Sequence, residues 1–357
     1  MIYKTFGKTG KHVSAIGFGG MRFGSSLEES VGAVRKAGEL GINYFDTAPF
    51  YCDDKSEDIF GEAFRAMPNP FYVSTKSGER TADELRQQLD KSLRRLGVPK
   101  IDFFHIWCVL SLDDYRSRLK PGGAYEGAVK AKAEGLIEHI CISTHANGAE
   151  IRTIAEEGRF EGITLGYNAS NFPFRREGLQ AAHAQGMGVV TMNPLGGGLI
   201  PQNEKYFSFL RRNAGESIAQ AALRFNASHR EITVTLAGMG TAAEVVENAA
   251  AVNGLQELSA DEIMSLQGHV GENLNSLCTG CGYCAGCPEG IDIPKFMDAY
   301  NMYILTGDAK EIDNRLKWHW NMPAKGAARC IACGQCEEKC TQHLPIMERL
   351  KTVGERG

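Results

Sequence analysis

The most specific chemical signal in the sequence is a pair of cysteine runs near the C-terminus. Eight of the eleven cysteines lie in these runs at spacings of two or three residues. The first run holds Cys278, Cys281, Cys284 and Cys287, and the second holds Cys330, Cys333, Cys336 and Cys340. Thiolates at this spacing wrap a short loop around a soft metal centre, and four of them hold one cubane. The runs therefore predict two 4Fe–4S clusters, with four-cysteine zinc sites as the alternative.

A second candidate site begins where a short strand pattern over residues 42–46 ends. Asp46 stands at the C-terminal end of this run, and Tyr51 follows within five residues in a loop. Lys76 ends a later strand pattern. A phenol with an ordinary pKa of about 10 is a poor acid–base catalyst at neutral pH, and a nearby ammonium favours its phenolate. An aspartate beside that lysine orients it and balances its charge, so the three residues predict a proton-transfer site.

Regularly alternating elements must position these side chains. After a hairpin formed by residues 3–6 and 12–14, eight strand patterns alternate with eight helical patterns over about 250 residues, the size of a TIM (β/α)8 barrel. The strands are expected near 15–18, 42–46, 71–75, 101–107, 138–143, 161–167, 187–192 and 232–236. The helices are expected near 27–40, 56–66, 82–96, 122–134, 148–157, 175–185, 215–227 and 241–251.

A doubly wound open sheet is the alternative fold. It is disfavoured because the glycine-rich turn after the first strand, residues 17–22, lacks the last glycine of a dinucleotide-binding fingerprint. Barrel enzymes carry their chemistry at the C-terminal ends of the strands, and loops 7 and 8 commonly bind phosphate. Here those loops carry Gly196, Gly197, Gly198 and Gly238, and Thr241 is expected to cap the helix that follows.

The stretch Gly41–Gly61 (GINYFDTAPFYCDDKSEDIFG) resembles the active-site signature of the aldo-keto reductases. The resemblance implies a tyrosine that donates a proton to a carbonyl while NAD(P)H delivers hydride. Those roles fall on Asp46, Tyr51 and Lys76. By the same resemblance Ser143, Thr144 and Asn168 lie near the nicotinamide, and Glu247 and Asn248 contact adenine. The family's phosphate-binding arginine falls at Glu244, so NAD(H) is expected over NADP(H).

The fourth catalytic position departs from the family pattern. The family histidine normally lies five residues after the aspartate of its strand, and that place here holds Trp107. His105 lies two residues earlier and shares the inward face of the strand. Either a bulge lifts His105 to the site as the catalytic histidine, or Trp107 replaces it. His145, at the end of the next strand, is the reserve candidate.

The C-terminal segment resembles a two-cluster ferredoxin, and the whole chain resembles a branch of the aldo-keto reductases that carries such a tail. In two-cluster ferredoxins the fourth cysteine of each run binds the other cluster. Carried over, one cluster takes Cys278, Cys281, Cys284 and Cys340, and the other takes Cys330, Cys333, Cys336 and Cys287. The implied domains are a barrel over residues 1–262 and a small, mainly helical ferredoxin-like domain over residues 263–357.

Bulk properties narrow the function classes. A net charge of −4 gives no electrostatic case for nucleic acid or an anionic membrane, and no run is apolar enough to span a bilayer. The start of the chain lacks the apolar core of a signal peptide, so we expect a cytoplasmic protein. The interpretation is an iron–sulfur oxidoreductase acting on a small-molecule substrate, with a redox protein as a further partner. The alternative is a non-catalytic electron carrier or redox sensor on a barrel scaffold.

Overall fold

The computed structural model describes residues 1–24, 26–67, 70–274 and 276–356. Eight parallel strands, β3 to β10, close into a barrel in chain order, because β10 pairs with both β9 and β3. The strands are β1 (Tyr3–Thr5), β2 (His12–Ser14), β3 (Ile16–Gly19), β4 (Tyr44–Asp46), β5 (Tyr72–Ser77), β6 (Ile101–Val109), β7 (Ile137–Thr144), β8 (Gly162–Gly166), β9 (Gly188–Met192) and β10 (Val234–Gly238). The predicted TIM barrel is confirmed, and the open sheet is wrong.

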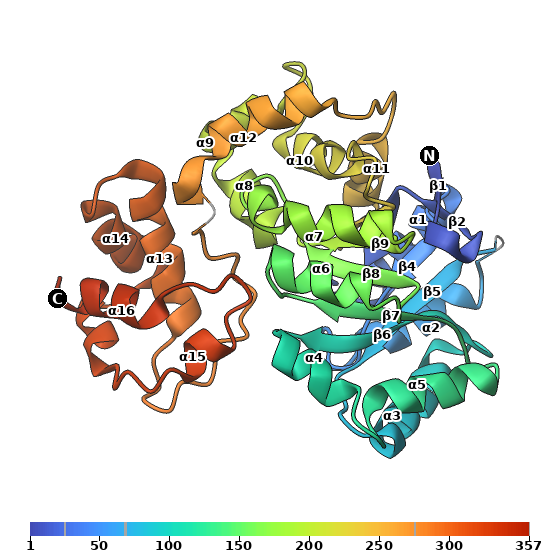
Figure 1. The fold of residues 1–357 in the computed structure, drawn as a ribbon. Helices are drawn as coiled ribbons and strands as arrows, with labels where there is room; N and C mark the ends of the chain where they lie inside the picture. The colour runs from blue at the N-terminus through green and yellow to red at the C-terminus, as the bar shows by residue number, and fades with distance from the viewer. Residues whose placement is uncertain (25, 68–69, 275, 357) are drawn as a thin grey trace.

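Helices surround the barrel on the outside (Figure 1). They are α1 (Leu27–Glu39), α2 (Ser56–Phe64), α3 (Ala82–Leu96), α4 (Leu112–Arg118), α5 (Ala124–Ala133), α6 (Gly148–Glu156), α7 (Phe172–Ala184), α8 (Leu199–Gln202), α9 (Glu204–Phe207), α10 (Ile218–Ala227) and α11 (Ala242–Ala250). Short 3-10 segments are η1 (Gly7–Thr9), η2 (Gly196–Gly198) and η3 (Ser208–Leu210). Side chains cap several starts: Thr81 accepts from the Glu84 amide, and Asn147 forms a capping box with Glu150.

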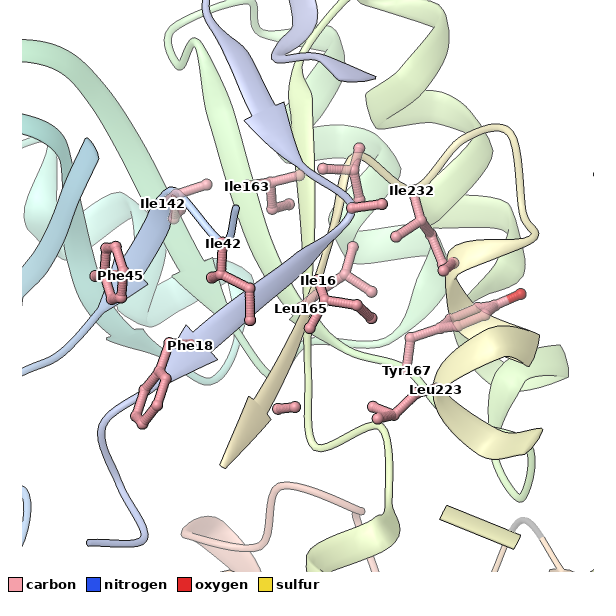
Figure 2. Packing of buried hydrophobic residues seen from close by; sticks show 14 of the residues in the cluster. Ile16, Phe18, Ile42, Phe45, Ile142, Ile163, Leu165, Tyr167, Leu223 and Ile232 are labelled. Atoms are coloured by element: carbon pink, nitrogen blue, oxygen red, sulfur yellow. The ribbon is translucent and has the colours of Figure 1, made fainter. Parts of the chain in front are cut away.

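The main core fills the layer between the strands and these helices. Figure 2 shows part of it, with Phe18, Phe45 and Ile163 among the packed side chains. A second cluster occupies the inside of the barrel at its N-terminal end. There Phe6, from the loop after β1, packs against Phe103 with ring centroids 4.1 Å apart and the rings tilted by 35°. This plug closes one end of the barrel and leaves the C-terminal ends of the strands as its open face.

The C-terminal segment forms a smaller helical unit with its own core. Its elements are α13 (Ile293–Thr306), α14 (Lys310–Asn314), the π-helix η4 (Arg315–Trp320), the 3-10 segment η5 (Ala324–Arg329), α15 (Gln335–Glu338) and α16 (Ile346–Gly354). Figure 1 shows these helices gathered on one side of the barrel, with α12 (Ala260–Leu274) leading to them.

Helix α12 bears on the boundary between the two units. Its buried residues Ile263 and Val270, and Leu277 after it, pack in the core of the barrel and not in that of the small unit. We therefore propose to draw the boundary near residue 277, although the composition of the sequence placed it at 262. Among the described residues, no helix combines the length and apolarity that a membrane crossing requires.

Candidate active site and cysteine cavities

A cavity of about 340 Å³ lies at the C-terminal end of the barrel. The barrel contributes Gly19, Gly20, Met21, Arg22, Asp46, Tyr51, His145, Gly166, Met192, Asn193, Pro194, Leu195, Gly197, Gly198, Leu236 and Gly238. The small unit contributes Thr279, Cys281, Tyr283, Thr341 and Gln342. The site is therefore built by both units, and the sequence patterns gave no sign of the second contribution.

Asp46 and Lys76 form a buried ion pair beside this cavity. Asp46 ends β4 and is 3% exposed, and Lys76 on β5 is 1% exposed. Lys76 Nζ lies 2.5 Å from Asp46 Oδ2 and donates to the carbonyl of Thr47 at 2.8 Å. The Ser74 hydroxyl donates to Asp46 Oδ1 at 2.7 Å. Adjacent parallel strands thus hold the lysine in one position with its charge balanced.

Tyr51 lies against this pair, in the loop between β4 and α2. Lys76 Nζ is 5.3 Å from the centroid of the Tyr51 ring. Phe50, Cys52, Asp53 and Asp54 all have positive φ, a conformation that costs about 1–3 kcal/mol for each such residue. Salt bridges from α3 to Asp54 anchor this loop. The loop therefore presents Tyr51 to the cavity at the expense of backbone strain.

The electrostatics of Tyr51 differ from the sequence-based expectation. Burial raises the pKa of Tyr51 well above its ordinary value. Charge repulsion from Asp46, Tyr283 and Cys108 raises this pKa further. The expected net lowering of the Tyr51 pKa is wrong, because burial of the phenol dominates its electrostatics. Tyr51 is accordingly a neutral phenol at neutral pH and suits proton donation.

Trp107 occupies the position next to Tyr51 at the end of β6. Its ring meets the Tyr51 ring edge-on, with centroids 5.9 Å apart. His105 is fully buried, paired in register with Lys76, and absent from the cavity lining. Burial, with Lys76 adding to it, lowers the pKa of His105 to about 3. Its Nδ1 lies 3.5 Å from the Thr164 hydroxyl. Trp107 does not line the cavity either, so which of the two acts as the fourth catalytic residue stays a prediction.

His145 is the histidine that does line the cavity. Neither of its ring nitrogens has a hydrogen-bond partner among the described residues, although both are buried. Burial lowers its pKa to about 3, with Arg175 and His343 adding to the effect. Its ring meets that of Tyr283 at 5.6 Å. A neutral imidazole with free nitrogens at a cavity wall is equipped to hydrogen-bond a ligand.

The three residues expected near the nicotinamide lie at the same end of the barrel but differ in their partners. Ser143 is buried, and its hydroxyl has no partner among the described residues. The Thr144 hydroxyl donates to the carbonyl of Val109 at 3.0 Å. The Asn168 amide donates to the carbonyl of Asn193 at 3.1 Å, which positions loop 7. None of the three lines the cavity, so their contact with a nicotinamide stays a prediction.

The loop glycines that were expected to bind phosphate differ in whether they line the cavity. Gly197, Gly198 and Gly238 line the cavity, whereas Gly196 does not. A Cβ on Gly197 would lie 2.1 Å from the carbonyl oxygen of Thr279. The close approach that this glycine permits is therefore taken by the small unit's own backbone, where a phosphate was expected.

The predicted adenine-binding segment lies on α11, outside the cavity. Thr241 caps the helix as expected, because its hydroxyl accepts from the Glu244 amide at 3.2 Å. The Glu244 carboxylate in turn accepts from the Gly240 amide at 2.6 Å. Glu247 is exposed and Asn248 is buried. The Glu244 carboxylate thus bonds the backbone at the helix start, a role that the resemblance to the family did not imply.

Arg22 is a site residue that the sequence reasoning missed. It follows β3 and is the one cation in the cavity lining among the described residues. A Cβ on Gly238 would lie 2.9 Å from Arg22 Cγ, so the absence of a side chain at Gly238 makes room for it. By its pattern alone, the glycine-rich turn before Arg22 indicates only an incomplete dinucleotide fingerprint. Its place after the first barrel strand was the signal that could have identified it.

The eight cysteines of the two runs line two further cavities. Cys278, Cys281, Cys284 and Cys340, the inner set, surround one of them. Cys287, Cys330, Cys333 and Cys336, the outer set, surround the other together with Cys284. The inner cavity gathers three thiols of the first run and one of the second, and the outer cavity gathers three of the second run and two of the first. Thiols of both runs thus line each cavity, as the crossed arrangement implied by the resemblance requires, and which four thiols bind which cluster stays a prediction.

A buried arginine at the start of α7 joins the two units. Arg175 is 0% exposed and donates to the barrel carbonyls of Ala146, Gly166 and His145 at 3.1–3.3 Å. It also donates to the Thr341 carbonyl of the small unit at 2.6 Å. The Arg175 guanidinium therefore holds the small unit over the barrel opening. No motif in the sequence indicates this role.

The family model for "Aldo/keto reductase family" matches residues 15–270. The chain belongs to the aldo/keto reductase family. A second model, "4Fe-4S dicluster domain", matches residues 277–344, which supports iron–sulfur clusters over zinc in the cysteine cavities. This aldo-keto reductase is thus an oxidoreductase with a 4Fe–4S dicluster domain, and the idea of a non-catalytic barrel is disfavoured.

Named relatives agree with this assignment. L-galactose dehydrogenase of Arabidopsis thaliana is 30% identical over 295 residues, covering 72% of this chain and 90% of the relative. Pyridoxine 4-dehydrogenase of Escherichia coli is 26% identical over 299 residues, covering 75% and 99%. The relatives match the barrel portion of the chain in length.

Solved structures show the same fold. The holo form of an aldo-keto reductase from Bacillus halodurans superposes with a TM-score of 0.64 at 23% identity, covering 75% of this chain and 96% of that one. An aldo-keto reductase from Klebsiella pneumoniae, solved in complex with NADPH, gives a TM-score of 0.61 at 22% identity, covering 75% and 95%.

Proposed function

We propose that this aldo-keto reductase interconverts a small carbonyl compound and its alcohol, with Tyr51 as the proton donor and acceptor. The observation that carries the proposal is the position of Tyr51, which lines the cavity while the Lys76–Asp46 pair lies behind its ring. A nicotinamide cofactor, when bound, supplies or accepts the hydride. The chain's own residues then have to place the carbonyl, move one proton and keep water out.

The raised pKa of Tyr51 suits the reductive direction. The phenol holds its proton at neutral pH and donates it as negative charge develops on the carbonyl oxygen. The Lys76 ammonium stabilises the phenolate that remains, and it cannot move toward the substrate because Asp46 and the Thr47 carbonyl hold it. His145, with two free ring nitrogens, is positioned to orient the substrate oxygen.

The cavity supports a nicotinamide dinucleotide through Arg22 and the loops that end β9 and β10. Arg22 supplies a cation for a pyrophosphate, and Gly198 and Gly238 leave room beside it. The Klebsiella structure contains NADPH. In this chain the charge nearest the loop 8 helix start is the Glu244 carboxylate, which would repel a 2′-phosphate. We therefore propose NAD(H) as the preferred cofactor.

The two cysteine sets are proposed to hold one 4Fe–4S cluster each, which would supply single-electron transfer. Cys278, Cys281, Cys284 and Cys340 would bind one, and Cys287, Cys330, Cys333 and Cys336 the other. Anaerobically prepared protein should contain about eight irons per chain. Zinc in place of iron, without visible absorbance, would contradict this assignment. We also propose a cytoplasmic location, because a reducing compartment preserves thiolate ligands. A redox protein partner completes the proposal.

The deciding experiment replaces Tyr51 with phenylalanine. Tyr51→Phe keeps the ring and removes the exchangeable proton, so carbonyl reduction should slow by about 10²–10⁴-fold. Tyr125→Phe is the matched control: its hydroxyl bonds the Arg159 carbonyl on the outside of the barrel, and its activity should stay unchanged. A folded, iron-loaded Tyr51→Phe protein that turns over at the native rate would show that the barrel chemistry does not use this phenol.

A further inference from the structure

Three cavities in the described part of the chain lie in a row, and each neighbouring pair shares wall residues. The barrel cavity and the inner cysteine cavity share Thr279, Cys281, Thr341 and Gln342. The inner and outer cysteine cavities share Cys284. The inner set thus lies between the barrel site and the outer set, and one of its thiols faces both the barrel cavity and the proposed cluster.

The outer set has a different environment. Cys333 is exposed, and its neighbour Ile331, which lines the same cavity, is 60% exposed. No residue of the barrel lines the outer cavity. A ligand in the barrel can therefore touch the surroundings of the inner set without reaching those of the outer set.

Thr341 makes the contact between the barrel and the inner set. Its hydroxyl lies 3.3 Å from Cys281 Sγ, and its carbonyl accepts from the buried Arg175 at 2.6 Å. A cysteine that binds iron is a thiolate without a proton, so in the loaded protein the Thr341 hydroxyl must be the donor. In the common bacterial run a proline follows the last cysteine. This chain has at that place a residue that can hydrogen-bond a ligand sulfur.

We propose that Thr341 couples the barrel cavity to the inner cluster by tuning its reduction potential through Cys281. A hydrogen bond to a ligand sulfur stabilises the reduced, more negative state and raises the potential. A ligand in the barrel cavity displaces water from the wall formed by Cys281 and Thr341, and so changes the potential of the inner cluster alone. The proposal rests on the proposed function in that it requires the two clusters.

The test is an anaerobic redox titration of the full iron-loaded chain, followed by electron paramagnetic resonance. Thr341→Val keeps the shape of the side chain and removes the donor, so one of two midpoint potentials should fall while the other stays. Thr279→Val is the matched control, because Thr279 lines the same two cavities but its hydroxyl has no partner among the described residues. It should leave both midpoints unchanged, and Thr341→Ser should keep the native values.

A second arm uses the unmodified protein, so it does not depend on the stability of any variant. Saturating NAD⁺, with binding followed by calorimetry, should shift the same midpoint that Thr341→Val shifts. Bound NAD⁺ that shifts neither midpoint or both alike would overturn the coupling, as would a Thr341→Val protein with native midpoints. If NAD⁺ does not bind, the nucleotide assignment fails, and the Thr341 variants alone decide the coupling.

Discussion

The walls of the barrel cavity come from two regions that work in different ways. The barrel wall carries formal charge in Asp46 and Arg22, and Asp46 forms a buried, mutually neutralised pair with Lys76 beside the cavity. The small unit's wall carries neutral side chains, backbone carbonyls and the Cys281 sulfur. The difference fits the proposal that proton transfer belongs to the barrel, whereas the small unit closes the site and brings Cys281, a proposed cluster ligand, to it.

The largest effect is expected in the barrel wall. Lys76→Met leaves the Asp46 carboxylate buried without its partner, which should cost about 3–5 kcal/mol of unfolding free energy. Turnover should fall by about 10²-fold or more, because the phenolate of Tyr51 loses its stabilising cation. Denaturant titration and steady-state kinetics measure the two effects.

The double variant Asp46→Asn/Lys76→Met sharpens this result. It removes both charges, so it should recover much of the stability but none of the turnover. Recovery of activity along with stability would mean that the barrel wall supplies packing and no charge chemistry.

Arg175 tests the link between the two walls. Arg175→Met removes the donor to four buried carbonyls, so we expect a loss on the order of 3 kcal/mol and release of the small unit from the barrel. Limited proteolysis near residue 277 should become faster. Arg116→Met, which loses only an exposed ion pair with Asp113, is the control and should change stability by less than about 1 kcal/mol. Equal stability of the two variants would deny Arg175 its joining role.

Gly197 tests how closely the small unit packs against the loop after β9. Gly197→Ala would place a Cβ 2.1 Å from the Thr279 carbonyl oxygen, in addition to the strain of φ +69°. Gly158→Ala has a similar φ of +66° but meets nothing within 4 Å, so it should cost only about 1–2 kcal/mol. The Gly197 variant should cost more than this control and should lower ligand affinity. Equal thermal stability of the two variants would show that the small unit can move away from loop 7 at this contact.

The smallest effect is expected at Glu244, on the rim of the barrel wall. Glu244→Gln removes the charge but keeps an acceptor for the Gly240 amide, so the helix cap should survive. The preference for NADH over NADPH should narrow by about tenfold, which corresponds to about 1.4 kcal/mol. Glu262→Gln, at an equivalent cap on α12, is the control and should leave the preference unchanged. A native protein that already binds NADPH more tightly would contradict the proposed role of this carboxylate.

The sequence alone determined the features that depend on short-range spacing. Period-two and helical patterns placed all eight barrel strands and the main helix after each strand within a few residues, because both periods arise from local backbone geometry, but they missed the short helices α4, α8 and α9. Asp46 and Tyr51 were found together because one strand end and one loop carry both. The cysteine runs predicted clusters because a cubane is wrapped by neighbouring residues.

Tertiary structure decided what depends on contacts between distant segments. The ring of Trp107 meets that of Tyr51 within a stretch where the register of β6 against β7 shifts, between Ile106 and Val109, and no pattern in the strand reveals this shift. Arg175 bonds Thr341 across 166 positions of sequence, and so brings Cys281 to the barrel cavity. The sequence supplied the candidate groups of the barrel, but packing between the two units decided which residues of the small unit share their cavity, because proximity at that range is set by the folded chain as a whole.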